Sequence, residues 1–279
     1  MRSLAIPGWG PGLQERLLAG ISAVGDFQLE HFGRLDPEEL DEKSGHSDLV
    51  SWVDRESEAR LAELLSQLYP AAGLVGEEGL SSPGEGEFRW LVDPLDGTTN
   101  YAYEHPFFSI SVALLAGSEP RLGVVHAPRL GETFQAYAAG PALCGSAPLR
   151  VSRRRDPRHA LFATGFADRR RVHARVNLGN FDRVLHATRG VRRAGSAALD
   201  LAFTAAGRLD GFWEMGLGPW DVAAGIFLVR AAGGSVSDFR GEADALSCRH
   251  IVASNGHLHA WLLQQLELDP VFSGPVGGL

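Results

Sequence analysis

The chain has 279 residues, 44% of them hydrophobic and 22% charged, which is the composition of a globular protein long enough for two lobes. Its formal net charge of −8 argues against a general nucleic-acid binder. The only two cysteines, Cys144 and Cys248, exclude a disulfide framework and a cysteine-rich zinc site, and they favour a reducing, cytoplasmic compartment. The first residues do not read as a signal peptide, and no apolar run reaches the roughly 18 residues of a membrane span, so we expect no membrane partner.

The first half of the chain predicts two amphipathic helices followed by a series of strands. Leu17, Ile21 and Val24 fall on one helical row, and a helical row recurs after the acidic stretch 36–48. The helices are expected over residues 12–33 and 51–68. The strands are expected over residues 74–78, a short apolar run that ends in paired acids, and over 90–93, 109–114, 122–126 and 133–137, the last three antiparallel.

Strands and helices alternate in the second half, which indicates a layered α/β lobe. The strands are expected over residues 159–164, 189–193, 209–214, 235–238 and 250–254. The helices are expected over residues 171–186, 196–206, 220–232 and 257–267. The polar, arginine-rich segment 145–158 predicts a boundary between an N-terminal lobe, 1–148, and a C-terminal lobe, 149–279. The Gly/Pro-rich tail after Asp269 is expected to be poorly ordered.

The apolar run at 90–92 leads into two carboxylates three residues apart, Asp93 and Asp96. Pro94 lies between them, and because proline lacks a backbone donor and has a fixed φ, the strand is expected to end there. Gly97 permits a sharp turn, and hydroxyl and amide side chains follow at 98–100. Such a turn can hold a hard cation against an anionic ligand. The alternative is that both aspartates only cap the next segment.

Four acidic clusters lie where a predicted element begins or ends: Asp54, Glu77 with Glu78, Asp93 with Asp96, and Asp221. An all-oxygen set of this kind suits Mg²⁺ or Mn²⁺. The ten histidines are scattered without zinc spacing, and His257 and His259 are expected to face solvent. Each cluster also has a simpler interpretation, because acids favour the first turn of a helix and paired glutamates occur in solvated turns.

Three motifs resemble, in order and spacing, the signature of the inositol monophosphatase family, and the resemblance extends from about residue 26 to residue 266. The motifs are Gly76-Glu77-Glu78; Trp90-x-x-Asp93-Pro94-x-Asp96-Gly97-Thr98-Thr99-Asn100; and Trp220-Asp221-x-Ala223-Ala224-Gly225 followed by Ala231-Ala232-Gly233-Gly234.

This resemblance implies an α+β fold, a layered αβαβα sandwich with an antiparallel sheet in the N-terminal lobe and mixed α/β structure in the C-terminal lobe. It implies a Mg²⁺-dependent, Li⁺-sensitive phosphomonoesterase, usually a homodimer, that binds two or three Mg²⁺ ions, with Mn²⁺ as a substitute. The expected substrate is inositol-1-phosphate or a similar small phosphorylated polyol or sugar. The main metal and phosphate site would lie in the N-terminal lobe, and the substrate-side residues would lie in the C-terminal lobe.

By the family pattern, Glu77, Asp93 and the carbonyl of Leu95 would hold the first metal. Asp93, Asp96 and Asp221 would hold the second, and Glu77 would also face a third, weaker site. A shared carboxylate of this kind would set the separation of two cations that bind the attacking and leaving oxygens of an in-line displacement.

The same pattern makes Asp54 and Thr98 a hydrogen-bonded pair that, with Glu77, positions and deprotonates the attacking water. The backbone amides of Gly97 and Thr98 would receive the phosphate. The alcohol part of the substrate would meet Gly195, Ser196, Ala197, Glu214 and Asp96. Two further candidates are Lys43, the only lysine in the chain, and Glu78.

The substrate and the role in the cell stay open at this point. Fructose-1,6-bisphosphate, histidinol phosphate and 3′-phosphoadenosine 5′-phosphate are the rival substrates. Thr99 and Asn100 favour the inositol branch, since the nucleotide and histidinol branches of the superfamily usually carry other residues there. Trp52, Gly79, Ser196 and Pro219 depart from residues common in the family, and none of these departures removes an expected ligand. A non-catalytic, metal-binding regulator with a protein or RNA partner is the second hypothesis. It would use the arginines Arg150, Arg153, Arg154, Arg155, Arg169, Arg170 and Arg171, which otherwise form a solvated face.

Overall fold

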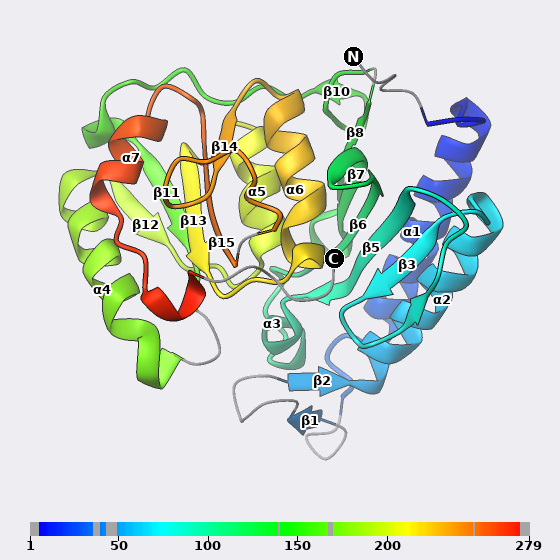
Figure 1. Ribbon diagram of the computed structural model, residues 1–279. Coiled ribbons are helices and arrows are strands. Elements are labelled where there is room, and N and C mark those ends of the chain that lie inside the picture. Colours follow the sequence, from blue (N-terminus) through cyan, green and yellow to red (C-terminus); the bar gives the residue numbers. More distant parts are fainter. Residues whose placement is uncertain are drawn as a thin grey trace.

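The computed structural model describes residues 6–35, 40–42, 49–138, 140–166, 170–247 and 249–273. Helices and sheets alternate in five layers, as the resemblance implies (Figure 1). Two sheets enclose a central pair of helices, and a further helix pair covers the outer face of each sheet. The outer pair of the first sheet is α1 (Pro11–His31) and α2 (Trp52–Leu68); the central pair is α5 (Ala197–Ala205) and α6 (Pro219–Ala231); the outer pair of the second sheet is α4 (Arg170–Ala187) and α7 (His259–Gln265).

The first sheet has eight strands in the order β10-β9-β8-β7-β6-β5-β3-β4. All neighbours are antiparallel except β3 and β5, which run parallel. The strands are β3 (Gly73–Gly76), β4 (Ser81–Ser82), β5 (Phe88–Asp96), β6 (Ser109–Ala116), β7 (Glu119–Ala127), β8 (Glu132–Tyr137), β9 (Leu143–Cys144) and β10 (Ala147–Pro148).

The second sheet has five strands in the order β12-β11-β13-β15-β14, and it is mixed, because β11 runs parallel to β12 and β13 while β15 runs antiparallel to β13 and β14. Its strands are β11 (Leu161–Thr164), β12 (Gly190–Arg192), β13 (Gly211–Met215), β14 (Ser235–Ser237) and β15 (His250–Ser254). The remaining elements are the hairpin β1 (Leu40–Glu42) and β2 (Leu49–Ser51), the short helix α3 (Thr98–Ala102), and three 3-10 turns at Pro128–Leu130, Pro157–His159 and Pro270–Phe272.

The central helices approach each other and the first sheet closely because glycines lie at the points of contact. A Cβ at Gly225 of α6 would lie 2.5 Å from Leu201 of α5, and one at Gly123 of β7 would lie 2.8 Å from the carbonyl oxygen of Ala224. Such approaches leave no space for a larger side chain. The two sheets therefore share one helical layer. The division of the chain into an N-terminal lobe, 1–148, and a C-terminal lobe, 149–279, stays a prediction.

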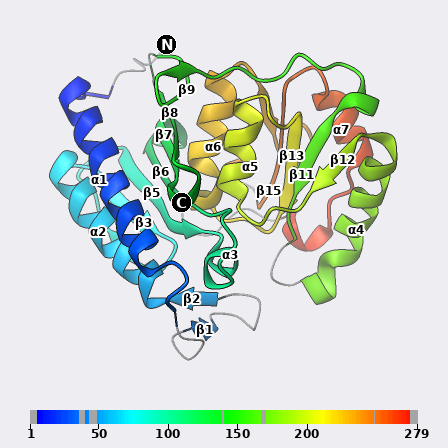
Figure 2. The same cartoon turned by 180° about the vertical axis from the view of Figure 1, so that it is seen from behind.

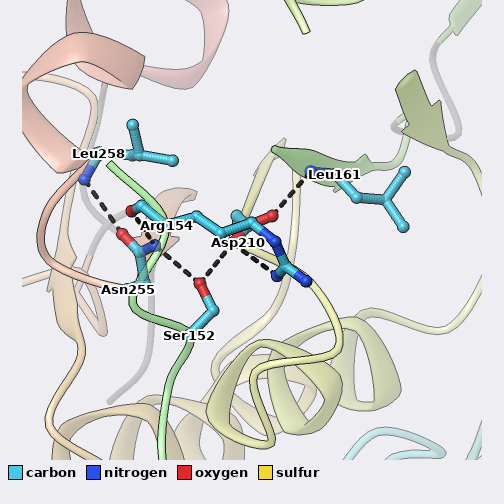
Figure 3. Close-up of polar contacts among 6 residues, drawn as sticks. All are labelled: Ser152, Arg154, Leu161, Asp210, Asn255 and Leu258. Atoms are coloured by element: carbon cyan, nitrogen blue, oxygen red, sulfur yellow. Dashed lines mark hydrogen bonds and ion pairs between the residues drawn. The ribbon is translucent and has the colours of Figure 1, made fainter. Parts of the chain in front are cut away.

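A polar network fixes the segment that connects the two sheets (Figure 3). The buried carboxylate of Asp210 accepts hydrogen bonds from Ser152 Oγ and, over 2.8 Å, from the amide of Leu161, and Arg154 pairs with it over 3.2 Å. Asn255 donates to the hydroxyl of Ser152 and to the carbonyl of Arg154. The connection is thus held by side-chain hydrogen bonds to the buried Asp210 and from Asn255. No helix in the described part of the chain has the length and apolar character needed to cross a membrane.

Three expectations from the sequence are wrong. β5 does not end at Pro94 but continues to Asp96, because the ladder with β6 is irregular between Asp93 and Asp96 and proline is tolerated at such a bulge. His259 does not face solvent: its ring nitrogens lie 2.9 and 3.0 Å from two serine hydroxyls. Part of the tail is ordered, since Phe272 is buried.

Candidate active site

Three elements bring acidic side chains to one place. Glu77 follows β3, Asp93 lies near the end of β5, and Asp221 is in the first turn of α6. One carboxylate oxygen from each of them lies within 4.8 Å of the others. Because β3 and β5 are parallel, their ends meet at the same edge of the sheet, and the amide of Glu77 donates to the carbonyl of Val92 over 3.0 Å.

The third carboxylate, that of Asp221, is held near Asp93 by contacts between α6 and β6. Ser111 of β6 pairs in register with Asp93, and its hydroxyl donates to the carbonyl of Trp220 over 3.1 Å. The next residue, Asp221, accepts from the amide of Gly218 over 2.7 Å, which fixes the start of α6. Three elements from both halves of the chain thus converge on the edge formed by β3 and β5.

Burial and mutual repulsion act together on these carboxyls. Asp93 is 1% exposed. Burial, followed by the charges of Glu77, Asp96 and Asp221, holds its pKa well above the ordinary range. Burial and the charge of Glu77 raise the pKa of Asp221 in the same direction. A cluster in which carboxylates repel one another and offer only oxygen atoms fits a hard divalent cation such as Mg²⁺ or Mn²⁺.

Asp96 is bonded to the start of α5, and its charge adds to the burial and the charge of Glu77 that raise the pKa values of Asp93 and Asp221. Its Oδ2 accepts from the hydroxyl of Ser196 over 2.6 Å and from the amide of Ala198 over 2.7 Å, and its Oδ1 accepts from the amide of Ala197 over 3.3 Å. Burial nevertheless raises the pKa of Asp96 to about 6. Asp96 thus bridges the end of β5 and the start of α5, and the metal-binding role that the resemblance implies for it stays a prediction.

Asp54 and Thr98 form the pair that the resemblance implies. The hydroxyl of Thr98 lies 2.8 Å from Asp54 Oδ1 and 3.2 Å from the carbonyl oxygen of Leu95. The other oxygen of Asp54 accepts from both the amide and the hydroxyl of Ser51, which caps α2. Asp54 is fully buried, and burial, the largest influence, raises its pKa.

The backbone at position 97 requires a glycine. Its φ is +101°, and a Cβ would lie 3.1 Å from the carbonyl oxygens of both Phe107 and Gly195. It begins the short helix α3, which lies between α2 and α5 in both views (Figures 1 and 2). Asn100 of α3 donates to the carbonyls of Phe107 and Ala194 over 2.6 and 2.8 Å. Asn100, which the sequence presents as a clue to substrate, ties two loops together.

The residues expected on the alcohol side gather around the start of α5. Gly195 has a φ of +91°, and Ser196 caps the helix. Glu214 of β13 is 8% exposed. It packs so closely on Gly165 that a Cβ at Gly165 would overlap the carboxylate of Glu214. Its charge adds to the burial and to the charges of Glu77 and Asp96 that raise the pKa of Asp221.

The remaining sequence candidates are placed as follows. The amide of Glu78 donates to Glu58, and Lys43 lies outside the described residues. Trp52 packs edge-on against Phe27 and His31, with ring centroids 5.9 and 4.7 Å away, so this departure from the family contributes to packing.

Sequence reasoning missed two buried acids near the site. Asp200 of α5 is 2% exposed, and burial and the charges of Glu214 and Asp96 hold its pKa well above the ordinary range. A single acid in the apolar run 197–203 is the signal that could have revealed it. Glu58 is 3% exposed and lies one helical turn after Asp54, so the i, i+4 spacing could have revealed it.

Comparison with known proteins agrees with this geometry. The family model described as "Inositol monophosphatase family" matches residues 17–269. The chain is 41% identical over 234 residues to an inositol-1-monophosphatase of Synechocystis sp., covering 84% of this chain and 82% of that protein. It is 40% identical over 262 residues to a Nus factor SuhB of Pseudomonas aeruginosa, covering 92% and 96%. The crystal structure of the extragenic suppressor protein suhB from Bartonella henselae superposes with a TM-score of 0.85 at 35% identity, covering 92% of this chain and 98% of that one. A match of this extent, together with the five-layer fold, shows that the chain belongs to the inositol monophosphatase family.

Proposed function

We propose that the protein is a Mg²⁺-dependent phosphomonoesterase that hydrolyses inositol-1-phosphate or a similar small polyol or sugar phosphate. The observation that carries the proposal is the convergence of Glu77, Asp93 and Asp221 within 4.8 Å beside the Asp54–Thr98 pair. Family membership and the name of the Synechocystis relative support it.

The proposed metal ligands are those implied by the family pattern. Glu77, Asp93 and the carbonyl of Leu95 would hold one cation, and Asp93 and Asp221 would hold another. Asp96 would join the second set through lone pairs that its bonds to α5 leave available. When bound, such cations lower the pKa of a water molecule and offset charge on phosphoryl oxygens.

The Asp54–Thr98 pair would position the attacking water and receive its proton. Because the hydroxyl of Thr98 donates to Asp54, its oxygen is left to accept a hydrogen bond from water. A proton can then pass from water to Thr98 as the hydrogen of Thr98 moves to Asp54. The raised pKa of Asp54 favours this transfer, since a more basic carboxylate accepts a proton more readily.

The substrate would lie between the start of α3 and the start of α5. The amides of Gly97 and Thr98 would receive the phosphate. On the alcohol side, Gly195, Ser196, Ala197, Glu214 and Asp96 would meet the substrate. All of these residues except Asp96 come from the C-terminal lobe, so the substrate would be enclosed by both lobes.

A phosphate-release assay tests the proposal directly. Inositol-1-phosphate, fructose-1,6-bisphosphate, histidinol phosphate and 3′-phosphoadenosine 5′-phosphate would be compared with Mg²⁺ and with EDTA. We expect Mg²⁺-dependent, Li⁺-sensitive release that is fastest from inositol-1-phosphate and lost in Asp93→Asn. Brisk release from another ester, with none from inositol-1-phosphate, would move the chain to another substrate class. No release from any ester would overturn the enzymatic proposal.

A regulatory role is the second candidate, because the Pseudomonas aeruginosa relative is named a Nus factor. Arg150, Arg153 and Arg155 are exposed and could meet a protein or RNA partner, but Arg154 pairs with the buried Asp210 and is part of the fold. The test is to express the Asp93→Asn variant in cells from which the gene has been deleted. If this variant releases no phosphate but still restores the wild-type phenotype, the regulatory role would be favoured.

We also propose that the protein is a homodimer, which light scattering after size-exclusion chromatography would test.

A further inference from the structure

The buried face of α2 carries two acids, and each contacts a different segment of the candidate site. Asp54 bonds to Thr98, which follows β5. Glu58, one helical turn later, bonds to the turn that follows β3 and contains Glu77. Both acids are buried, with 0% and 3% of their surface exposed.

The Glu58 carboxylate holds this turn through two backbone amides. Oε1 accepts from the amide of Glu78 over 2.9 Å, and Oε2 accepts from the amide of Leu80 over 3.2 Å. The amide of Gly76 donates to the carbonyl of Leu80 over 2.9 Å and closes the turn. Glu77 lies inside a loop whose backbone is fixed on both sides.

The strand before the turn is shaped to admit Glu58. A Cβ at Gly76 would lie 2.7 Å from the carboxyl carbon of Glu58, and nearer still to its Oε1. Any larger residue at this position would push the carboxylate away from the two amides. The strand end and the helix side chain therefore depend on each other.

Only a carboxylate can make both contacts. An ionised carboxylate offers acceptors on both oxygens, whereas the glutamine amide offers one acceptor and would direct N–H groups at the second backbone amide. A buried carboxylate beside other acids is costly unless its hydrogen bonds are satisfied. The hydrogen bonds of Glu58 are satisfied by the backbone around a residue proposed to bind metal.

We propose that Glu58 is a positioning residue of the metal centre: by binding the amides of Glu78 and Leu80, it holds Glu77 facing Asp93 and Asp221. This inference rests on the proposed role of Glu77 as a metal ligand. Groups that orient ligands in this way typically contribute about 10- to 100-fold to metal affinity.

Mn²⁺ binding, measured by the electron paramagnetic resonance of the free ion, tests the proposal without substrate. We expect Glu58→Gln to weaken Mn²⁺ binding about 10- to 100-fold. The Mg²⁺ concentration for half-maximal phosphate release should rise by the same factor, with kcat at saturating Mg²⁺ changed much less. Leu65→Ala is the matched control, because Leu65 is equally buried on α2 and packs in the apolar cluster of α1, α2 and the first sheet. It should lower the melting temperature and leave Mn²⁺ affinity unchanged.

Unchanged Mn²⁺ affinity in Glu58→Gln would overturn the proposal. Wild-type protein that binds Mn²⁺ but releases no phosphate would contradict only the proposed function, because the Mn²⁺ comparison would still be decided. Wild-type protein that binds no Mn²⁺ would overturn both.

A double-mutant cycle gives a second, independent test. Gly76→Ala should weaken Mn²⁺ binding in the wild type by displacing Glu58. In the Glu58→Ala background the added methyl group has room, so the same change should have little further effect. Additive losses would contradict the proposal. If Glu58→Gln fails to fold, amide hydrogen exchange of residues 77–81 in the wild type decides: exchange as fast as in an open turn would overturn it.

Discussion

Thr98 brings two parts of the site together through its hydroxyl and begins α3. It lies 2.8 Å from Asp54, 3.2 Å from the carbonyl of Leu95, and next to Gly97 at the start of α3. Asp54 is in turn fixed by the cap of α2. The pair therefore has little freedom to reorganise, which suits a proton-transfer relay.

We expect Asp54→Asn and Thr98→Val each to lower kcat by about 10²- to 10⁴-fold, the usual contribution of a positioned acid or base. Because the two residues act as one unit, the double variant should be no slower than the worse single variant. Phosphate release at saturating Mg²⁺ measures this, and Mn²⁺ affinity should be unchanged in both. Losses that multiply would show that the two residues act separately.

At the scale of elements, α6 determines where Asp221 lies. It approaches β7 so closely that a Cβ at Gly123 would lie 2.8 Å from the carbonyl oxygen of Ala224. Moving α6 outward would separate Asp221 from the end of β5. Packing remote from the site thus supports the spacing of the carboxylates.

Gly123→Ala should therefore destabilise the fold by about 1–3 kcal/mol, as overpacked cores do, and should also weaken Mn²⁺ binding. Gly86→Ala is the control, because a Cβ there meets nothing within 4 Å and should change neither property. Denaturant unfolding and Mn²⁺ titration measure the two effects. A Gly123→Ala protein with wild-type stability would contradict the importance of this contact.

The sequence predicts best those helices and strands that are long enough to show a regular repeat of apolar residues. α1, α2 and the buried strands of the first sheet meet that condition, and their predicted ranges agree closely with the structure. α3 was expected as a turn, because five residues are too few to show a helical period. β5 continues beyond Pro94 because a bulge tolerates the proline, and this depends on the partner strand.

At the scale of the whole molecule, the candidate site depends on elements from both halves of the chain. The order of residues could indicate that Glu77, Asp93 and Asp221 end elements, but their convergence depends on how α6 packs across the sheet. The resemblance to the family supplied that relation. Glu58 and Asp200 were missed for the same reason, since nothing local in the sequence says what faces a buried acid.

The raised pKa values make metal-dependent stability sensitive to pH. Asp96 has its pKa raised from 3.8 to about 6, and Asp93 has its pKa raised well above 3.8. Because the folded state then holds protons that the unfolded state has lost, these groups stabilise the metal-free fold at low pH. That contribution is lost as the pH rises through their folded pKa values. Metal binding must displace the same protons, so Mg²⁺ should stabilise the fold more at pH 7.5 than at pH 5.

The quantity to measure is the melting temperature with Mg²⁺ minus the melting temperature with EDTA. We expect this difference to be several degrees smaller at pH 5 than at pH 7.5. Taking the difference removes the opposite effect of His126, His250 and His259, whose pKa values are lowered by burial and whose contribution is the same with and without Mg²⁺. Asp93→Asn should abolish the difference at every pH. A difference that stays constant from pH 7.5 to pH 5 in the wild type would mean that these carboxyls do not take up protons when the metal leaves, and that the cation binds elsewhere.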